Sequence, residues 1–434
     1  MRSKIFLFSL LCASGLFGEV LTFSQAYLLA LEHNHKFKSE KLYNLSHKER
    51  LKQTESGLYP KLDLSGYYKN SDLKLNQDGS PHTRQGLFNL SLSLKQSIYN
   101  PSLYSEIEVE KLRAKIGDVD VTMSKKELAQ EVFEAYLKLL KSLNKIELYK
   151  AYLHYSNSKL QMIEKKYAIN LSNKMDLLEV KVAHNSAKID LKREKKILQS
   201  YRLELEHLIG TDAYVLPRID SDNAILESLP IMESVVLDVK LKNNLDIQKA
   251  SLNFALAQKE IKNAYNGHLP KLDLSAGYSR YETDTPTIDA PYEYTQMVMV
   301  SLNVPLFSGW YTTSKIDEAK YLQDARKESL ADVQKETDIR YEELIASFEA
   351  ASASVKMYKE AIESAALFVK SVQLGYEHGL KNMVDLDEAK SKYYKIRYEY
   401  VENIYELVSS YIGILILSND FEKIEILDKI VAEN

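Results

Sequence analysis

The sequence PKLDLS occurs twice, at residues 60–65 and 270–275, and a glycine and a tyrosine follow within a few residues of each copy. The two copies are 210 residues apart (270 − 60), which is close to half of the 434-residue chain. Other landmarks keep nearly the same spacing, namely Asn34 with Asn244, Tyr99 with Phe307, Tyr167 with Tyr376, Asp176 with Asp385, and Glu179 with Glu388. A period of this length exceeds that of a solenoid repeat and predicts tandem duplication of a whole structural unit.

Each PKLDLS copy opens a region in which apolar and polar residues alternate. In the first repeat the alternation covers 61–70 and 86–96, and in the second it covers 271–281 and 295–304. A polar loop separates the two stretches of each pair. A period of two residues with one polar face is typical of a strand that contacts two different environments.

Long segments with few helix-breaking residues follow each strand pair. Residues 311–374 contain neither glycine nor proline, and residues 102–169 contain only Gly117. One helix over 311–374 would be about 96 Å long, which is more than an ordinary globular core requires. The returning segments, 177–208 and 386–417, carry heptad patterns that predict coiled-coil packing. Residues 21–57 are expected to form one further helix, which ends before Pro60.

The N-terminus has the order of a secretory signal peptide. Arg2 and Lys4 precede an apolar run over 5–12, and small residues follow up to Gly18. Two alternatives are an ordinary N-terminal strand and, because of Cys12, a lipoprotein signal, although the bulky Leu11 disfavours the second. No later segment has about 18 consecutive apolar residues, so an integral membrane position would require a closed β-barrel.

Composition excludes several other classes of protein. The net charge is −4, which argues against a large basic surface for nucleic acid. Cys12 is the only cysteine and lies in the predicted signal, so no disulfide or thiolate site is expected in the mature chain. The nine histidines form no ligand-spaced cluster, and we expect no catalytic residues, no metal site and no cofactor.

These patterns divide the chain into consecutive segments. The predicted segments are a signal peptide (1–18), a first repeat (19–210), a linker or equatorial segment (211–235), a second repeat (236–418) and a short C-terminal tail (419–434). Each repeat reads helix, strand pair, long helix and returning helix. Four strands per chain are too few to close a membrane barrel, whereas three chains would supply twelve. The alternative is a soluble helical protein that carries two hairpins.

The chain resembles the TolC-like outer-membrane efflux protein family over nearly its whole mature length. The resemblance rests on the proline-led strand pairs, on the turns at 98–101 and 305–309, and on the stretch 376–407. In that stretch the family pattern of a tyrosine, a glycine and two acids reads Tyr376, Gly379, Asp385 and Glu388. Two departures are Asn170, where the family usually has glycine in the first repeat, and Glu388, where aspartate is common.

The resemblance implies a fold and a function. The expected fold is α with membrane β: a homotrimeric 12-stranded outer-membrane β-barrel continued by a long periplasmic α-helical coiled-coil barrel. The expected function is passive conduction in a tripartite efflux or type I secretion system. The implied partners are a periplasmic adaptor protein, an inner-membrane pump or ABC transporter, and outer-membrane lipid. Drugs, metal ions and secreted proteins are all compatible cargoes. The alternatives are a periplasmic coiled-coil adaptor or scaffold without a pore, and an enzyme that uses the acid pair for general acid–base catalysis.

The resemblance also implies roles for particular residues. Asp385 and Glu388, three apart on a helix, would form acid rings at the periplasmic entrance. Tyr376 and Lys381 would reach Asp176 in a link that keeps the entrance narrow. The turns expected to meet the adaptor consist of Ile169, Asn170, Leu171, His378, Gly379 and Leu380. The alternative for each of these residues is an ordinary turn or a solvated surface charge.

Overall fold

A computed structural model describes residues 21–73, 83–215, 224–237, 241–283 and 293–420. The predicted signal peptide lies outside these residues, as do parts of the predicted linker, tail and strand-connecting loops. The chain divides into two compact units. Unit 1 contains Met1–Ser39, Thr122–Leu245 and Gln334–Asn434, and unit 2 contains Glu40–Val121 and Asp246–Val333. The two longest helices, α3 (Pro101–Ala168) and α7 (Tyr311–Glu377), contribute to both units.

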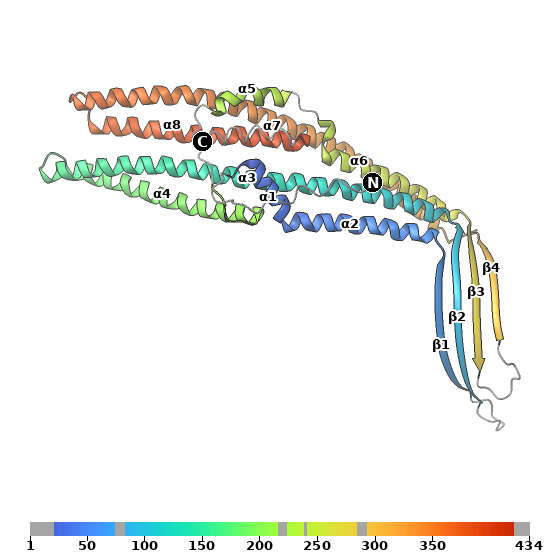
Figure 1. Ribbon diagram of the computed structural model, residues 1–434. Coiled ribbons are helices and arrows are strands. Elements are labelled where there is room, and N and C mark those ends of the chain that lie inside the picture. The colour runs from blue at the N-terminus through green and yellow to red at the C-terminus, as the bar shows by residue number, and fades with distance from the viewer. Residues whose placement is uncertain (1–20, 74–82, 216–223, 238–240, 284–292, 421–434) are drawn as a thin grey trace, which may run out of the picture. The chain divides into compact units, whose positions relative to one another are not determined.

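Unit 2 contains a four-stranded antiparallel sheet with the order β1-β2-β3-β4 (Figure 1). Its strands are β1 (Lys61–Leu73), β2 (Thr83–Tyr99), β3 (Lys271–Thr283) and β4 (Glu293–Asn303). Each repeat supplies one hairpin, and the β2–β3 pairing joins them. Four strands and long helices in two copies confirm the predicted fold class for a single chain. Among the residues that the structure describes, β1 and β4 are edge strands, each paired on one side only.

The strand register sorts side chains onto two different faces. Leu64 pairs with Leu92, and Leu274 pairs with Val300, so one face is apolar across all four strands. The opposite face is polar: Ser65 pairs with Ser91, and their hydroxyl oxygens are 2.8 Å apart. Val298, on the apolar face, is 77% exposed in the single chain. An apolar face left this open must be covered by something other than the chain itself.

The helices of unit 2 continue the order of the strands. They are α2 (His35–Glu55), the beginning of α3, α6 (Leu245–Tyr265) and the beginning of α7. Lys48 and Asp118 join α2 to α3 at 2.7 Å, and Arg113 and Glu260 join α3 to α6 at 3.0 Å. An apolar cluster joins α6 to α7 and consists of Ala264, Ile316, Ala319 and Ile261.

Unit 1 is built on two helical hairpins. The first pairs the end of α3 with α4 (Lys174–Ile209), and the second pairs the end of α7 with α8 (Met383–Ser418). The first hairpin packs through Leu160, Ile163 and Val180. The second packs through Val372, Leu386 and Ala389. Buried members of the predicted heptads lie on these seams, as coiled-coil packing requires.

Two shorter helices, α1 (Phe23–His33) and α5 (Ala224–Leu237), complete unit 1. The predicted continuous helix over 21–57 is wrong, because the chain breaks between α1 and α2 at Asn34. Asn34 ends α1 in an extended conformation, and its side-chain oxygen accepts a hydrogen bond from the Phe37 N–H at 2.9 Å. A buried side chain that caps the next helix therefore redirects the backbone.

One described helix, over Val384–Ser418, is long and apolar enough to cross a membrane by length and composition. However, 67% of its apolar window is buried inside the protein. That burial is typical of a core helix, and Leu407, Ile414 and Leu417 on this helix are buried in unit 1.

Candidate functional site at the hairpin ends

The two hairpins of unit 1 end in the same turn. In the first, Asn170 has a φ of 60°, and the Leu171 N–H donates to the Lys166 carbonyl oxygen at 2.7 Å. In the second, Gly379 has a φ of 74°, and the Leu380 N–H donates to the Gly375 carbonyl oxygen at 2.7 Å. This bond from the residue after a left-handed position closes a helix C-terminus. Asn170 thus keeps the left-handed geometry in place of the usual glycine, because asparagine tolerates it better than most residues.

The returning helices also begin in the same way. Asn173 caps α4 by accepting from the Asp176 N–H at 2.8 Å, and Asn382 caps α8 by accepting from the Asp385 N–H at 2.9 Å. Each aspartate reaches back to the N–H of its capping asparagine, which completes a capping box in both repeats. Asp176 and Asp385 thus have a local structural task, whatever else they do.

The turns expose apolar side chains. Ile169 and Leu171 in the first turn and Leu380 in the second are all exposed, and Leu380 is 82% exposed. His378 and Gly379 are exposed as well. The residues predicted to meet an adaptor are therefore accessible in the single chain.

The residues of the predicted entrance link have different partners within one chain. Tyr376 does reach the first hairpin, where its hydroxyl accepts from Lys166 Nζ at 2.8 Å. Lys381, in the turn before α8, has its Nζ 4.0 Å from the carboxylate of Asp385 in the first turn of that helix. Asp176 is held by its capping box and by the Ser172 hydroxyl at 3.1 Å. The structure therefore brings Tyr376 to the first hairpin but pairs it with Lys166, and a link to Asp176 stays a prediction.

The predicted acid pair differs in environment. Asp385, in the first turn of α8, is half-buried, whereas Glu388, one turn later, is exposed. Among the described residues, neither acid forms a hydrogen bond or an ion pair with the first hairpin. Both are therefore available to face a space outside the single chain.

Sequence reasoning missed a third acid on the same turn of α8. The Asp387 carboxylate accepts from Lys159 Nζ at 2.8 Å and from the Tyr155 hydroxyl at 3.1 Å, and both partners lie on α3. Burial, followed by the nearby charge of Asp387, raises the pKa of Tyr155. Burial also lowers the pKa of Lys390, which lies 4.2 Å from the centre of the Tyr155 ring. This cluster couples the two hairpins near their ends.

A second polar cluster joins the same two helices farther from the turns. Glu402 on α8 pairs with Lys141 and with Lys145, the latter at 2.6 Å. Between the clusters, Tyr152 of α3 and Tyr394 of α8 pack edge to face with ring centres 5.4 Å apart. The contact of α3 with α8 thus includes polar and aromatic pairs, and an apolar cluster packs each hairpin near its turn.

Comparison of the sequence with models of known protein families identifies the family of this chain. The model of the outer membrane efflux protein family matches residues 26–211 and 236–417, once for each repeat. The chain belongs to the outer membrane efflux protein family. This membership confirms an outer-membrane efflux or secretion channel of the TolC type, with a periplasmic helical portion and no enzymatic activity. It also rules out the alternative of a periplasmic adaptor without a pore.

Individual relatives of the efflux family are distant in sequence but similar over most of their length. The chain is 20% identical to the outer membrane protein TolC of Vibrio cholerae, over 83% of each chain. It is 24% identical to the alkaline protease secretion protein AprF of Pseudomonas aeruginosa, over 72% of this chain and 66% of that one. The crystal structure of the Campylobacter jejuni CmeC outer membrane channel superposes with a TM-score of 0.73 at 15% identity, covering 99% of this chain and 98% of that one.

Membership of the efflux protein family gives each unit an environment. Strands of an outer-membrane channel place apolar residues toward lipid and polar residues toward the lumen, and the β1–β4 sheet has one face of each kind. The hairpins of unit 1 belong to the periplasmic helical portion. That their turns and acids form the periplasmic entrance stays a prediction.

Proposed function

We propose that the protein is a homotrimeric conduit in which three sheets close one barrel. The observation that carries this proposal is the pair of edge strands, β1 and β4, each paired on one side only within the chain. Unpaired strand edges cannot be left open in lipid. Three chains with four strands each would supply twelve strands, an even number within the range of bacterial barrels. Each β4 would then pair with β1 of the next chain.

The proposed conduit is passive and receives its cargo from other components. An inner-membrane pump or ABC transporter would supply the energy, and a periplasmic adaptor would connect that transporter to the hairpin turns. The family name refers to efflux, whereas AprF is named for secretion of an alkaline protease. Both tasks require the same conduit, so the proposal covers small-molecule efflux and type I secretion.

We propose the predicted segments as functional parts of this conduit. Residues 1–18 would direct export and be removed, and 211–235 would join the two repeats. At the entrance, three copies of Asp385 and Glu388 would form two acid rings that favour cations. Tyr376 and Lys381 would hold the entrance narrow, and the Lys166–Tyr376 hydrogen bond supports a role for Lys166 in the same closure.

The assembly is tested by native mass measurement of the protein extracted in mild detergent. The expected mass is that of three chains without the signal peptide, because the sheet edges then satisfy one another. A stable soluble monomer would contradict the proposal.

Replacement of Gly379 by valine is expected to lower export several-fold while the amount of trimer stays unchanged. A side chain at this positive φ is strained by about 1–2 kcal/mol or more, and a β-branched one is the least tolerant. Apart from Gly379 and its two chain neighbours, no described residue has an atom within 4 Å of the position that a Cβ would occupy, so the strain is confined to the turn. Export is measured in cells, and trimer is measured by immunoblot of unheated samples.

The matched control is Gly379→Asn, because Asn170 adopts the same conformation in the first repeat. Asparagine should preserve the turn and leave export normal. Equal export by the valine and asparagine variants would contradict a role of this turn in adaptor docking.

A further inference from the structure

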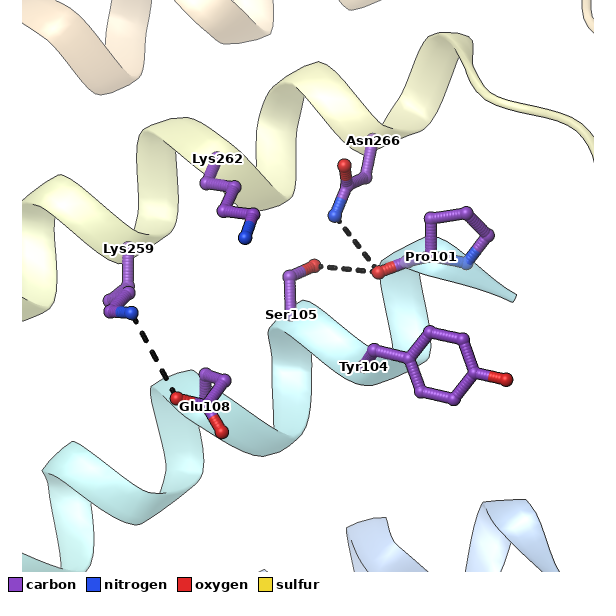
Figure 2. A pocket seen from close by; sticks show the side chains of 7 residues that line it. All are labelled: Pro101, Tyr104, Ser105, Glu108, Lys259, Lys262 and Asn266. Atoms are coloured by element: carbon purple, nitrogen blue, oxygen red, sulfur yellow. Dashed lines mark hydrogen bonds and ion pairs between the residues drawn. The ribbon is translucent and has the colours of Figure 1, made fainter. Parts of the chain in front are cut away.

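Unit 2 contains a cavity between the start of α3 and the end of α6, next to the sheet. The cavity has a volume of about 230 Å³. The lining residues come from one face of each helix and are Pro101, Tyr104, Ser105, Glu108, Lys259, Lys262 and Asn266 (Figure 2). The proposed conduit function does not require this cavity. Its residues are distant in sequence from the hairpin turns.

Two polar side chains of the lining already form hydrogen bonds within the protein. Asn266 is buried, and its amide donates to the Pro101 carbonyl oxygen at 2.9 Å. Ser105 is buried, and its hydroxyl lies 2.6 Å from the side-chain oxygen of Asn263. These groups fix α3 against α6 and have little capacity left for a ligand. The donors that remain for a bound molecule are the lysine ammonium groups.

The two lysines give the cavity a positive charge. Lys259 Nζ lies 3.9 Å from the Glu108 carboxylate, which is also 3.3 Å from Lys111 Nζ. Among the described residues no carboxylate lies within ion-pair distance of Lys262, and Figure 2 shows its side chain directed toward α3. With two ammonium groups and one carboxylate, the lining carries a net charge of about +1 at neutral pH.

One residue of the lining connects the cavity to the apolar face of the sheet. Tyr104 lines the cavity, and its ring packs edge to face on Tyr99, with ring centres 6.5 Å apart. Tyr99 pairs with Leu272 beyond the irregularity at the end of β2, so it lies on the apolar face with Leu274 and Leu92. The Tyr104–Tyr99 pair therefore links the lining of the cationic cavity to the apolar face of the sheet.

We propose that this cavity binds the phosphate of a membrane phospholipid, whose acyl chains lie on the apolar face above it. Lys262 is the principal phosphate ligand, and Lys259 is the second. A phosphodiester carries one negative charge and balances the net charge of the lining, whereas free phosphate carries about 1.5 negative charges at neutral pH and meets more repulsion from Glu108. The acyl chains of a phospholipid match the apolar face of the sheet, and its singly charged phosphate matches the cationic cavity.

The test is lipid titration of the detergent-extracted protein, followed by native mass spectrometry. Phosphatidylglycerol and phosphatidylethanolamine are added in separate arms, and inorganic phosphate is added as a competitor in a third. We expect saturable binding of one phospholipid per chain. The double variant Lys259→Ala, Lys262→Ala should bind about tenfold more weakly or worse, because each charge-assisted hydrogen bond to phosphate is lost.

Lys115→Ala is the matched control, since Lys115 is exposed and lies one heptad beyond Glu108 on the same face of α3. It should bind lipid as the wild type does. Equal lipid binding by the double variant would overturn the proposal. Displacement of the lipid by inorganic phosphate at equal concentration would also overturn it and would identify a free-anion site. None of the three lysines is fully buried, so the variants should fold. Equal yields of purified protein from the wild type and all variants would show this.

Discussion

Replacing Asp387 by alanine is expected to lower the free energy of unfolding by about 3 kcal/mol. Removing one partner of a buried ion pair costs about 3–5 kcal/mol, since it strands the other charge. Lys159 is the stranded charge here: its side chain is only 8% exposed, whereas that of Asp387 is 31% exposed, which places the expected loss at the low end. The Tyr155 hydroxyl loses its acceptor as well. The measurement is urea denaturation of the detergent-extracted protein, followed by the circular dichroism of the helices.

Two controls separate the ion pair from a general effect of removing an acid. Asp190 on α4 is 32% exposed, but its partner Arg193 is 65% exposed, so Asp190→Ala should cost less than about 1 kcal/mol. The double variant Asp387→Ala, Lys159→Met removes both charges and should recover much of the loss. Equal destabilisation by Asp387→Ala and Asp190→Ala would show that the contact between α3 and α8 does not depend on this pair.

Replacing Asp385 and Glu388 together by alanine is expected to reduce the cation selectivity of the channel about tenfold. A carboxylate about 8 Å from a cation contributes roughly 0.5 kcal/mol in water. Six carboxylates in the proposed trimer therefore sum to about 3 kcal/mol, and screening at physiological salt reduces that figure by about half. Multivalent cations should also block the variant more weakly. Ion permeability ratios and block are measured in planar lipid bilayers.

The control for this variant uses the duplication of the chain. Asp385 completes the capping box of α8, and Asp176 completes the equivalent box of α4. Asp176→Ala with Glu179→Ala therefore removes the same cap and the same net charge from the first repeat. Because Asp176 is also predicted to belong to the entrance link, this control should raise the conductance but leave the cation selectivity unchanged. Unchanged selectivity in the Asp385, Glu388 variant, or an equal change in both variants, would contradict the acid rings.

Much of the fold could be predicted because its signals are local. Alternation after residues 60 and 270 marks the strands, and the scarcity of glycine and proline marks α3 and α7. The break at Asn34 could not be predicted in this way. Residues on both sides of it have helical character, and the bend depends on a buried cap that forms only in the folded chain.

The same contrast applies to the candidate site. The turns at Asn170 and Gly379 are visible in the sequence, because few residues tolerate a positive φ. The Asp387 cluster is not visible, since Lys159 and Tyr155 lie more than 200 residues earlier in the chain. The available signal was the spacing of three and four residues between tyrosines and lysines on α3, such as Tyr152, Tyr155 and Lys159. That stripe predicts a shared helix face but not its partner.

The most direct measurement of the central claim is disulfide crosslinking between β1 and β4. Cys12 is the only cysteine and lies in the predicted signal, so the mature chain offers a cysteine-free background. One cysteine replaces Ser65 on β1, and a second is placed in turn at each position of β4. At the register where neighbouring chains pair, oxidation in the outer membrane should yield crosslinked species of two and three chains and nothing larger. Failure to crosslink at every register, or species that stop at two chains or extend beyond three, would contradict a barrel closed by three sheets.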